Sequence, residues 1–290
     1  MASLKEVKAR IGSVNSTLKI TGAMKMVSSA KLKKAQYAIE SITPYQSRLN
    51  KILSNFLATE TDFQSAFAEV RPVSRVAVIA FSSNSSLCGA YNSNVAKQLN
   101  VVVKEQLNSG AEVVVYPIGK KITEQSEKLG VPVVKSNNDM ADHPSFDAIS
   151  EVTNELMNKF LAKEFDKVIV VYHHLKNTAV QKLQTEVFLP ISLDKNSGDV
   201  DESTADYIVE PGKAEILESL LPKALRTKMY ACLLDSNASE HGARVVAMQV
   251  ATDNANELIN ELTILYNKTR QQAITNELLD IVGGAAALAQ

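Results

Sequence analysis

Regularly spaced apolar residues at both ends of the chain constrain its fold more than any other feature. Near the N-terminus they stand three and four positions apart, at Leu4, Val7, Ile11, Val14 and Leu18. A looser apolar stripe continues to Pro44, the only proline before Pro72. This spacing is typical of a coiled-coil seam, and the lack of earlier prolines favours a long helix. We expect one helix, or a bent pair, over residues 3–58, and residues 1–58 form the first predicted segment.

The C-terminal segment, residues 211–290, carries a matching pattern. A seam with the same spacing ends its apolar part at Leu265, after Met248, Ala251, Ala255, Leu258 and Leu262. A second stripe, which starts at Ile274, is apolar again but out of phase with the first. The helix is expected to begin near EPGKAEILESLLP, and Pro222 and Gly242 are expected to bend it early. Because the two seams lie at opposite ends of the chain, we expect them to pair as an antiparallel coiled coil.

Residues 73–200 follow a different pattern, in which short β-branched runs alternate with helical patterns. The runs are SRVAVIAFSS (74–83), AEVVVYPIG (111–119) and DKVIVVYHH (166–174), and the helical patterns cover 93–108, 120–129 and 145–164. This alternation predicts an α/β domain with a mostly parallel sheet. KLQTEVFLPIS (182–192) is expected as an antiparallel edge strand. The predicted fold class is therefore a Rossmann-like α/β domain inserted between two long helices that form an antiparallel coiled coil.

Charge is distributed unevenly along the chain, although the net charge is only −1. The first 35 residues carry a single acid, Glu6, and eight cations: Lys5, Lys8, Arg10, Lys19, Lys25, Lys31, Lys33 and Lys34. Residues 194–218 are strongly acidic. Such segregation favours an acidic partner for the basic end, either nucleic acid or an acidic protein surface, over a merely solvated helix face. Since no aromatic residue precedes Tyr37 for base stacking, an acidic protein surface is the preferred interpretation.

Catalytic chemistry is not indicated by the sequence. Neither glycine-rich phosphate-binding motif occurs, G-x-G-x-x-G or G-x-x-x-x-G-K-[ST]. The nearest candidate is the turn SSNSSLCGAYNSN, in which Ser82–Ser86, Gly89 and Asn92 would present backbone N–H groups to a phosphate. With a single glycine, a plain capped turn between a strand and a helix is the better interpretation.

Candidate metal ligands are equally few. His173 and His174 are adjacent in a predicted strand, so they point to opposite faces of the sheet and do not easily share a metal. Cys88 and Cys232 lie far apart without a C-x-x-C motif, which predicts two buried thiols in a reducing compartment. We therefore expect no catalytic residue, no cofactor and no bound metal.

Membrane insertion of the chain itself is not expected. The N-terminal sequence MASLKEVKARIG lacks the apolar core of a signal peptide. No apolar run approaches the ~18 residues that a membrane-spanning helix requires. We expect a soluble polypeptide whose association with a membrane is indirect, through partner proteins.

Three segments are distinctive beyond their periodicity. They are RIGSVNSTLKITGAMKMVSSAKLKKAQ (10–36), SSLCGAYNSN (85–94) and SEHGARVVAMQVATDNANELINELTILYNKTRQQAITNELLDIVGGAAAL (239–288). In sequence, order and spacing they resemble the gamma subunit, or central stalk, of the rotary F-type ATP synthases. The lack of a transit peptide favours the bacterial type.

The resemblance implies a non-catalytic rotor subunit. In this family the paired helices enter a ring of three alpha and three beta subunits, and the tail, here IVGGAAALAQ, turns in an apolar sleeve. The α/β domain and the lower coiled coil contact the epsilon subunit and the membrane c-ring. The implied function is to couple proton flow across the membrane to ATP synthesis or hydrolysis at the beta subunits, and to regulate ATPase activity. The implied location is peripheral, on the cytoplasmic face of the bacterial inner membrane.

The resemblance also implies which residues contact the ring. Three of them would meet the catch loop of a beta subunit: Arg270, Gln271 and Thr275. Three more would belong to the region that couples rotation to catalysis: Met24, Lys25 and Arg244. The basic helix would face acidic lever segments of the beta subunits, with three further candidate contacts: Lys31, Lys33 and Lys34.

The loop after the first predicted strand departs from the family pattern. Asn84, Ser85 and Ser86 stand where Asp-Arg-Gly is usual, so a charge-based role for this loop is not supported. The alternative function is a stand-alone nucleotide- or phosphate-binding α/β enzyme with helical dimerisation arms. The missing phosphate motifs argue against that alternative.

Overall fold

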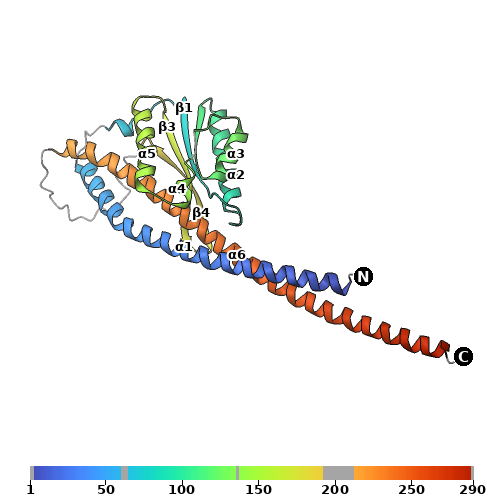
Figure 1. The fold of residues 1–290 in the computed structure, drawn as a ribbon. Coiled ribbons are helices and arrows are strands. Elements are labelled where there is room, and N and C mark those ends of the chain that lie inside the picture. The colour runs from blue at the N-terminus through green and yellow to red at the C-terminus, as the bar shows by residue number, and fades with distance from the viewer. Residues whose placement is uncertain (1–2, 60–64, 135–136, 192–211, 289–290) are drawn as a thin grey trace. The chain divides into compact units, whose positions relative to one another are not determined.

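The computed structural model of the protein describes residues 3–59, 65–134, 137–191 and 212–288. Two long helices, α1 (Leu4–Thr59) and α6 (Lys213–Leu288), lie at the ends of the chain (Figure 1). The chain divides into two compact units, and the division cuts both helices. One unit is Ser28–Arg244, and the other combines the residues up to Val27 with those from Val245 onward. The three segments expected from the sequence stay a prediction.

A four-stranded sheet forms the centre of the Ser28–Arg244 unit. Its strands are β1 (Arg75–Phe81), β2 (Glu112–Ile118), β3 (Lys167–Asn177) and β4 (Val180–Leu189), in the order β2-β1-β3-β4. Strand β1 pairs in parallel with both β2 and β3, while β4 pairs antiparallel with β3. The predicted parallel sheet with an antiparallel edge strand is therefore confirmed.

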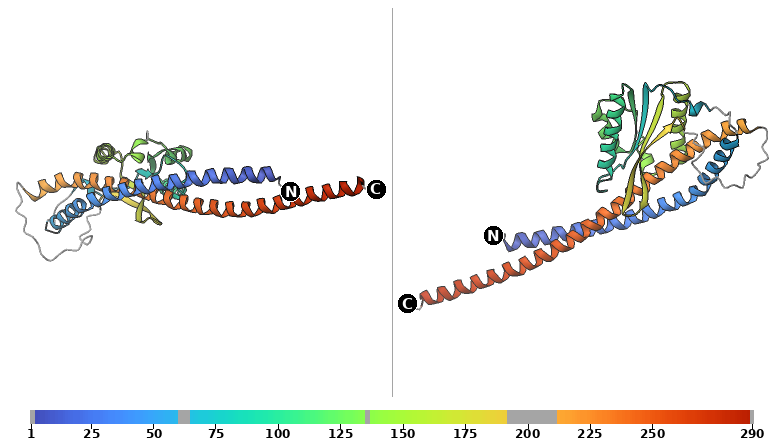
Figure 2. Two further views of the ribbon diagram at one scale, coloured as in Figure 1. Left: turned by 60° about the horizontal axis from the view of Figure 1, so that its bottom comes forward. Right: turned by 180° about the vertical axis from the view of Figure 1, so that it is seen from behind.

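Helices cover both faces of this sheet. They are α2 (Tyr91–Asn108), α3 (Lys120–Ser126), α4 (Asp139–Asp142) and α5 (Phe146–Leu161), with short 3-10 turns at Ala66–Ala68 and Glu127–Leu129. Figure 2 shows α2 and α3 on one side of the strands and α5 on the other. Helices α2, α3 and α5 lie close to the helical patterns expected from the sequence, whereas α4 was not predicted.

Alternation along β1 explains why both faces are covered. Val76, Val78 and Ala80 pack with residues of α2 and α3, such as Leu99 and Ile122. The intervening residues point the other way and pack with α5 and α6: Ala77, Ile79 and Phe81. Because successive strand residues point to opposite faces, a strand that is apolar at every position needs cover on both sides.

Helices α1 and α6 run antiparallel within this unit. Near the end of α1, Leu53 and Phe56 pack with Leu217 and Leu221, close to the start of α6. Earlier in α1, Leu32 and Ala35 pack with Ala238, which lies later in α6. As the contacts come earlier in α1 they come later in α6, so the two helices are antiparallel, as predicted from the seams.

Helix α6 continues without interruption through Pro222 and Gly242. The glycine has a packing reason, since a Cβ built on Gly242 would lie 3.3 Å from the carbonyl oxygen of Thr178, between strands β3 and β4. The absence of a side chain lets the β3–β4 hairpin approach the helix closely. Gly242 was expected to bend the helix, and in the structure it makes room for the close contact with Thr178.

The other unit contains the beginning of α1 and the second half of α6. A hydrogen bond of 3.0 Å joins the hydroxyl groups of Thr252 and Thr21. Buried residues occur on both helix segments: Val7, Thr21, Met248, Ala255 and Leu262. This pairing agrees with the predicted seams. No helix in the described part of the chain is long and apolar enough to span a membrane.

Candidate functional site: a polar network around Glu240 and Arg244

The loop between β1 and α2 is held at its start by the segment that connects β2 to α3. The N–H group of Ser82 donates to the carbonyl oxygen of Ile118, and the Ser82 hydroxyl accepts from the N–H group of Ile122 at 2.9 Å. Gly119, with φ of 105°, passes so close that a Cβ there would lie 2.2 Å from the Ser82 oxygen. Only glycine fits where these two segments of the backbone approach each other.

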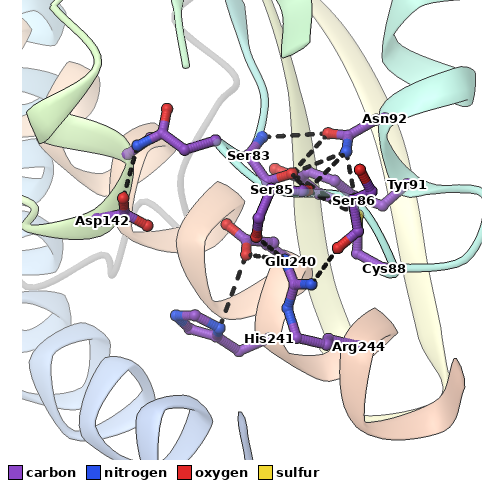
Figure 3. A network of polar contacts seen from close by, with 12 residues as sticks. Ser83, Ser85, Ser86, Cys88, Tyr91, Asn92, Asp142, Glu240, His241 and Arg244 are labelled. Atoms are coloured by element: carbon purple, nitrogen blue, oxygen red, sulfur yellow. Dashed lines mark hydrogen bonds and ion pairs between the residues drawn. The ribbon is translucent and has the colours of Figure 1, made fainter. Parts of the chain in front are cut away.

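Asn92, in the first turn of α2, holds the middle of the loop. Its Oδ1 accepts from the N–H group of Ser83 at 3.1 Å, and its Nδ2 donates to the carbonyl oxygen of Ser85 and to the Cys88 sulfur. Figure 3 shows these bonds converging on the amide. The polar side chains of this turn thus bond to the loop itself, which supports a plain turn rather than a phosphate site. The expected polar cap is not found, because the N-cap residue of α2 is Ala90 and no side chain caps the helix.

Asn84 ties the same loop to two helices. Its Nδ2 donates to Asp142 Oδ2 at 2.7 Å, and its Oδ1 accepts from the N–H group of Lys120 at 2.9 Å. An aspartate, usual at this position in the family resembled, would bring a second carboxylate against Asp142. Like charges at this distance repel, so the asparagine matches its surroundings.

Glu240 and Arg244, one turn apart on α6, form a buried ion pair. Arg244 Nη2 donates to Glu240 Oε1 at 2.6 Å, and the two side chains are only 8% and 4% exposed. The guanidinium also bonds to the loop, because Nη2 donates to the Ser85 hydroxyl at 2.9 Å and Nη1 donates to the Ser86 carbonyl oxygen (Figure 3). One side chain therefore joins helix α6 to two successive loop residues.

Burial controls the electrostatics around this pair. Burial raises the pKa of Glu240, while the bond from Arg244 acts in the opposite direction. Burial also lowers the pKa of His241 to about 4, assisted by the nearby cations Lys31 and Arg244. His241 Nδ1 lies 3.9 Å from Glu240 Oε1 and has no hydrogen-bond partner among the described residues. At neutral pH the imidazole is uncharged, so Arg244 is the hydrogen-bonded counter-ion of Glu240.

Tyr91 connects the start of α2 to α6 as well. Its hydroxyl group lies 2.9 Å from the carbonyl oxygen of Ser236 and 2.8 Å from the Ser236 hydroxyl. On its other side the Tyr91 ring stacks on His173. His174 points to the opposite face and bonds to Asp235 at 2.8 Å, so the prediction that the two histidines diverge is confirmed.

The residues predicted to contact partners lie in different environments. Met24 and Lys25 are half-buried on α1, and five others are exposed: Lys33, Lys34, Arg270, Gln271 and Thr275. Lys31 is exposed too, yet it influences Glu240 and His241 electrostatically. Arg244 is buried and bonded within the chain. Their roles as partner contacts stay predictions.

Sequence reasoning missed Glu240, Ser85 and Ser86 as members of a network. The one available signal was the spacing of four residues between Glu240 and Arg244, which brings opposite charges together on a helix. Cys88 and Cys232 are both buried and unpaired, as predicted. Within the described residues no group of three or more side chains could hold a metal ion.

The geometry defines a class of protein: a long antiparallel helix pair whose helices are anchored on an inserted α/β unit. Comparison with known sequences specifies the family. The family model described as ATP synthase matches residues 3–288. ATP synthase gamma chains of Phocaeicola vulgatus and Bacteroides fragilis are 53% and 55% identical, each over 99% of this chain and 100% of the relative. The chain belongs to the ATP synthase gamma-chain family.

A solved structure supports the fold. A chain in the mitochondrial ATP synthase of Euglena gracilis, from a structure of OSCP, F1 and the c-ring, aligns with a TM-score of 0.67. The alignment covers 98% of this chain and 94% of that chain at 21% identity. The likeness extends over almost the whole length, so it includes both long helices as well as the sheet.

Proposed function

We propose that this chain is the central-stalk rotor subunit of an F-type ATP synthase. It couples proton flow across the membrane to ATP synthesis or hydrolysis at beta-subunit catalytic sites, and it regulates ATPase activity. Family membership and the full-length fold likeness support this function over a stand-alone phosphate-binding enzyme. The chain itself is non-catalytic, in keeping with a strand-to-helix turn whose polar groups bond to one another.

One observation carries the proposal. From Ile264 onward, every α6 side chain that is described is exposed or half-exposed. Several are large and apolar, with exposures of 48% to 67%: Ile274, Leu278, Leu279, Ile281 and Val282. Apolar surface of this extent on a soluble chain marks a protein-binding surface. A surrounding ring of three alpha and three beta subunits would cover it, with an apolar sleeve around the tail.

The other partners follow from the same function. The α/β unit and the adjacent coiled coil bind the epsilon subunit and the c-ring. Membrane association is thereby indirect, and the subunit is peripheral on the cytoplasmic face of the bacterial inner membrane. Asymmetry of the shaft is essential, because a partner changes state only where its contacts differ between states. Exposed Lys31, Lys33 and Lys34 supply positive charge on α1 for such a shaft.

Reconstitution tests this function directly. The purified chain alone should show no ATPase turnover, whereas its addition to matching alpha and beta subunits should restore cooperative ATPase activity. The mass of the native complex should correspond to three alpha subunits, three beta subunits and one copy of this chain in the catalytic part. Failure to restore activity, or turnover by the chain alone, would reject the proposal.

A further inference from the structure

Helix α6 is attached to the α/β elements by a series of polar contacts. Arg244 makes the last contact of this series along the helix. Asp235 bonds to His174, and the Ser239 hydroxyl donates to the carbonyl oxygen of His173 at 3.2 Å. Asn237 donates to the carbonyl oxygen of Ala141 at 2.7 Å. Arg244 is the last residue of the Ser28–Arg244 unit. Its bonds to the loop are therefore the final attachment of α6 to this unit among the hydrogen bonds described above.

The loop held by Arg244 leads directly into the sheet. Residues 82–90 follow β1, an inner strand that pairs with both β2 and β3. The Arg244 guanidinium thus connects the last turn of α6 in this unit to Ser85 and Ser86, and through them to β1. Asn92 of α2 and Asp142 of α4 bond to the same loop, so the loop is held from three helices at once.

A contribution to folding stability does not by itself explain why Glu240 and Arg244 are buried as an ion pair. A buried ion pair often contributes no more than apolar residues of the same volume, because both charges lose their hydration. What arginine adds is a planar group with several donors, which can bond to a carboxylate and to a loop at once. Lysine has a single nitrogen and could neutralise Glu240 but not span the Ser85 hydroxyl and the Ser86 carbonyl in this geometry.

We propose that Glu240 and Arg244 are a positioning pair that locks the loop of residues 83–88 onto helix α6 and so transmits torque between the helix and the sheet. Glu240 orients the guanidinium, and the guanidinium holds the loop. The inference rests on the proposed rotor function and deepens it, since it assigns Arg244 an internal role in coupling. No other subunit is needed for the contact to form.

Conservative variants separate charge from geometry. Arg244→Lys keeps a cation beside Glu240 but gives up the bonds to the loop. Glu240→Gln keeps the shape and leaves Arg244 without its counter-ion. The double variant Glu240→Gln with Arg244→Met has neither charge, so it should fold even if a single change does not. Arg226→Lys is the matched control, because Arg226 lies on the same helix and its Nε donates within that helix, to the carbonyl oxygen of Pro222.

Hydrogen exchange of the whole purified chain gives the first readout. In Arg244→Lys and in the double variant, the amides of Ser83 and Tyr91, which bond to the Asn92 side chain and to the Cys88 carbonyl oxygen, should exchange about tenfold faster or more, as expected when the loop loses hydrogen bonds to a charged group. Amides in β1 and α5 should be unchanged, and Arg226→Lys should match the original chain. Unaltered exchange of the Ser83 and Tyr91 amides in both Arg244 variants would overturn the proposal.

Coupling in the reconstituted complex gives the second readout. Arg244→Lys should lower ATP-driven proton pumping per ATP hydrolysed, while ATP hydrolysis itself persists. Normal pumping by a variant with a loosened loop would refute the role in torque transmission. If the unmodified chain failed to restore ATPase activity, the rotor function itself would fall, and the two failures are therefore distinguishable.

Discussion

The imidazole of His173 stacks on the ring of Tyr91, with centroids 4.5 Å apart and ring planes inclined by 30°. His173 is 2% exposed, and its Nδ1 has no hydrogen-bond partner among the described residues. Burial lowers the pKa of His173 from 6.5 to about 4. The native state therefore holds a neutral imidazole over a range of pH in which the unfolded chain is protonated.

We expect His173 to make the protein less stable as the pH falls. Below pH 6.5 the unfolded state binds a proton that the native state refuses until about pH 4. The free energy of unfolding should fall across this window, with a limiting slope of about 1.4 kcal/mol per pH unit from this one group. Above the window its contribution is constant. Urea unfolding at a series of pH values measures the slope.

His173→Gln isolates that contribution. The variant should have a smaller slope between pH 6.5 and 4, whatever its absolute stability, and some slope will remain because the pKa of His241 is lowered in the same direction. An identical slope in the original chain and in His173→Gln would contradict the assignment.

Gly119→Ala should be strongly destabilising. The added Cβ would lie 2.2 Å from the Ser82 carbonyl oxygen, and φ at Gly119 is 105°, where side chains are disfavoured. Clash and strain together should cost more than about 3 kcal/mol. Gly110→Ala also has a positive φ, of 84°, but meets nothing within 4 Å, so it should cost only about 1 kcal/mol. Equal denaturation midpoints for the two variants would exclude the proposed clash.

The helices and the sheet were predictable from local patterns. Leu32 and Ala35 are buried because the apolar stripe before Pro44 places them on one side of α1, and that stripe is visible without any knowledge of the partner helix. Val76 and Ala77 are both buried in β1, as a continuous β-branched run indicates. In each case the information lies within a few residues of sequence.

The polar network was not predictable in the same way. Ser86 and Arg244 are 158 positions apart and meet only because the loop after β1 crosses the last turn of α6 in its unit. Serines are common in surface loops, so nothing at Ser85 or Ser86 indicated a buried guanidinium nearby. Asn92 was identified as polar and well placed, but its bonds go to the loop instead of a ligand.

Leu87→Gly should stabilise the isolated chain. Leu87 has φ of 68° and is 60% exposed, so it bears the strain of the left-handed region with little compensating burial. Relieving the strain should stabilise the folded chain by about 1–2 kcal/mol. Part of this gain, roughly 0.5–1 kcal/mol, is offset because glycine gives the unfolded chain more conformational freedom. The free energy of unfolding should rise by up to ~1 kcal/mol. Leu107→Gly, an exposed site within α2, should instead lower it by about 1 kcal/mol.

Raising ionic strength should weaken assembly with the beta subunits. Lys33 and Lys34 are exposed on α1, and the Debye length falls from about 8 Å at 0.15 M salt to about 3 Å at 1 M. Titration of complex formation against salt measures the dependence. The double variant Lys33→Gln with Lys34→Gln should show a shallower dependence, and an unchanged one would mean that these cations face water.

Arg270→Ala should impair assembly or coupling while leaving the isolated chain folded. Arg270 is exposed on α6, so its removal should change the free energy of unfolding by less than ~0.5 kcal/mol. A charge-assisted contact with the catch loop of a beta subunit is worth about 1.5–3 kcal/mol, which corresponds to roughly 10- to 150-fold weaker association. Lys268→Ala removes an exposed cation two residues earlier on the same helix, where no contact is proposed. ATP synthesis by the reconstituted complex should decline in Arg270→Ala alone, and equal synthesis by both variants would show that the arginine contact is incidental.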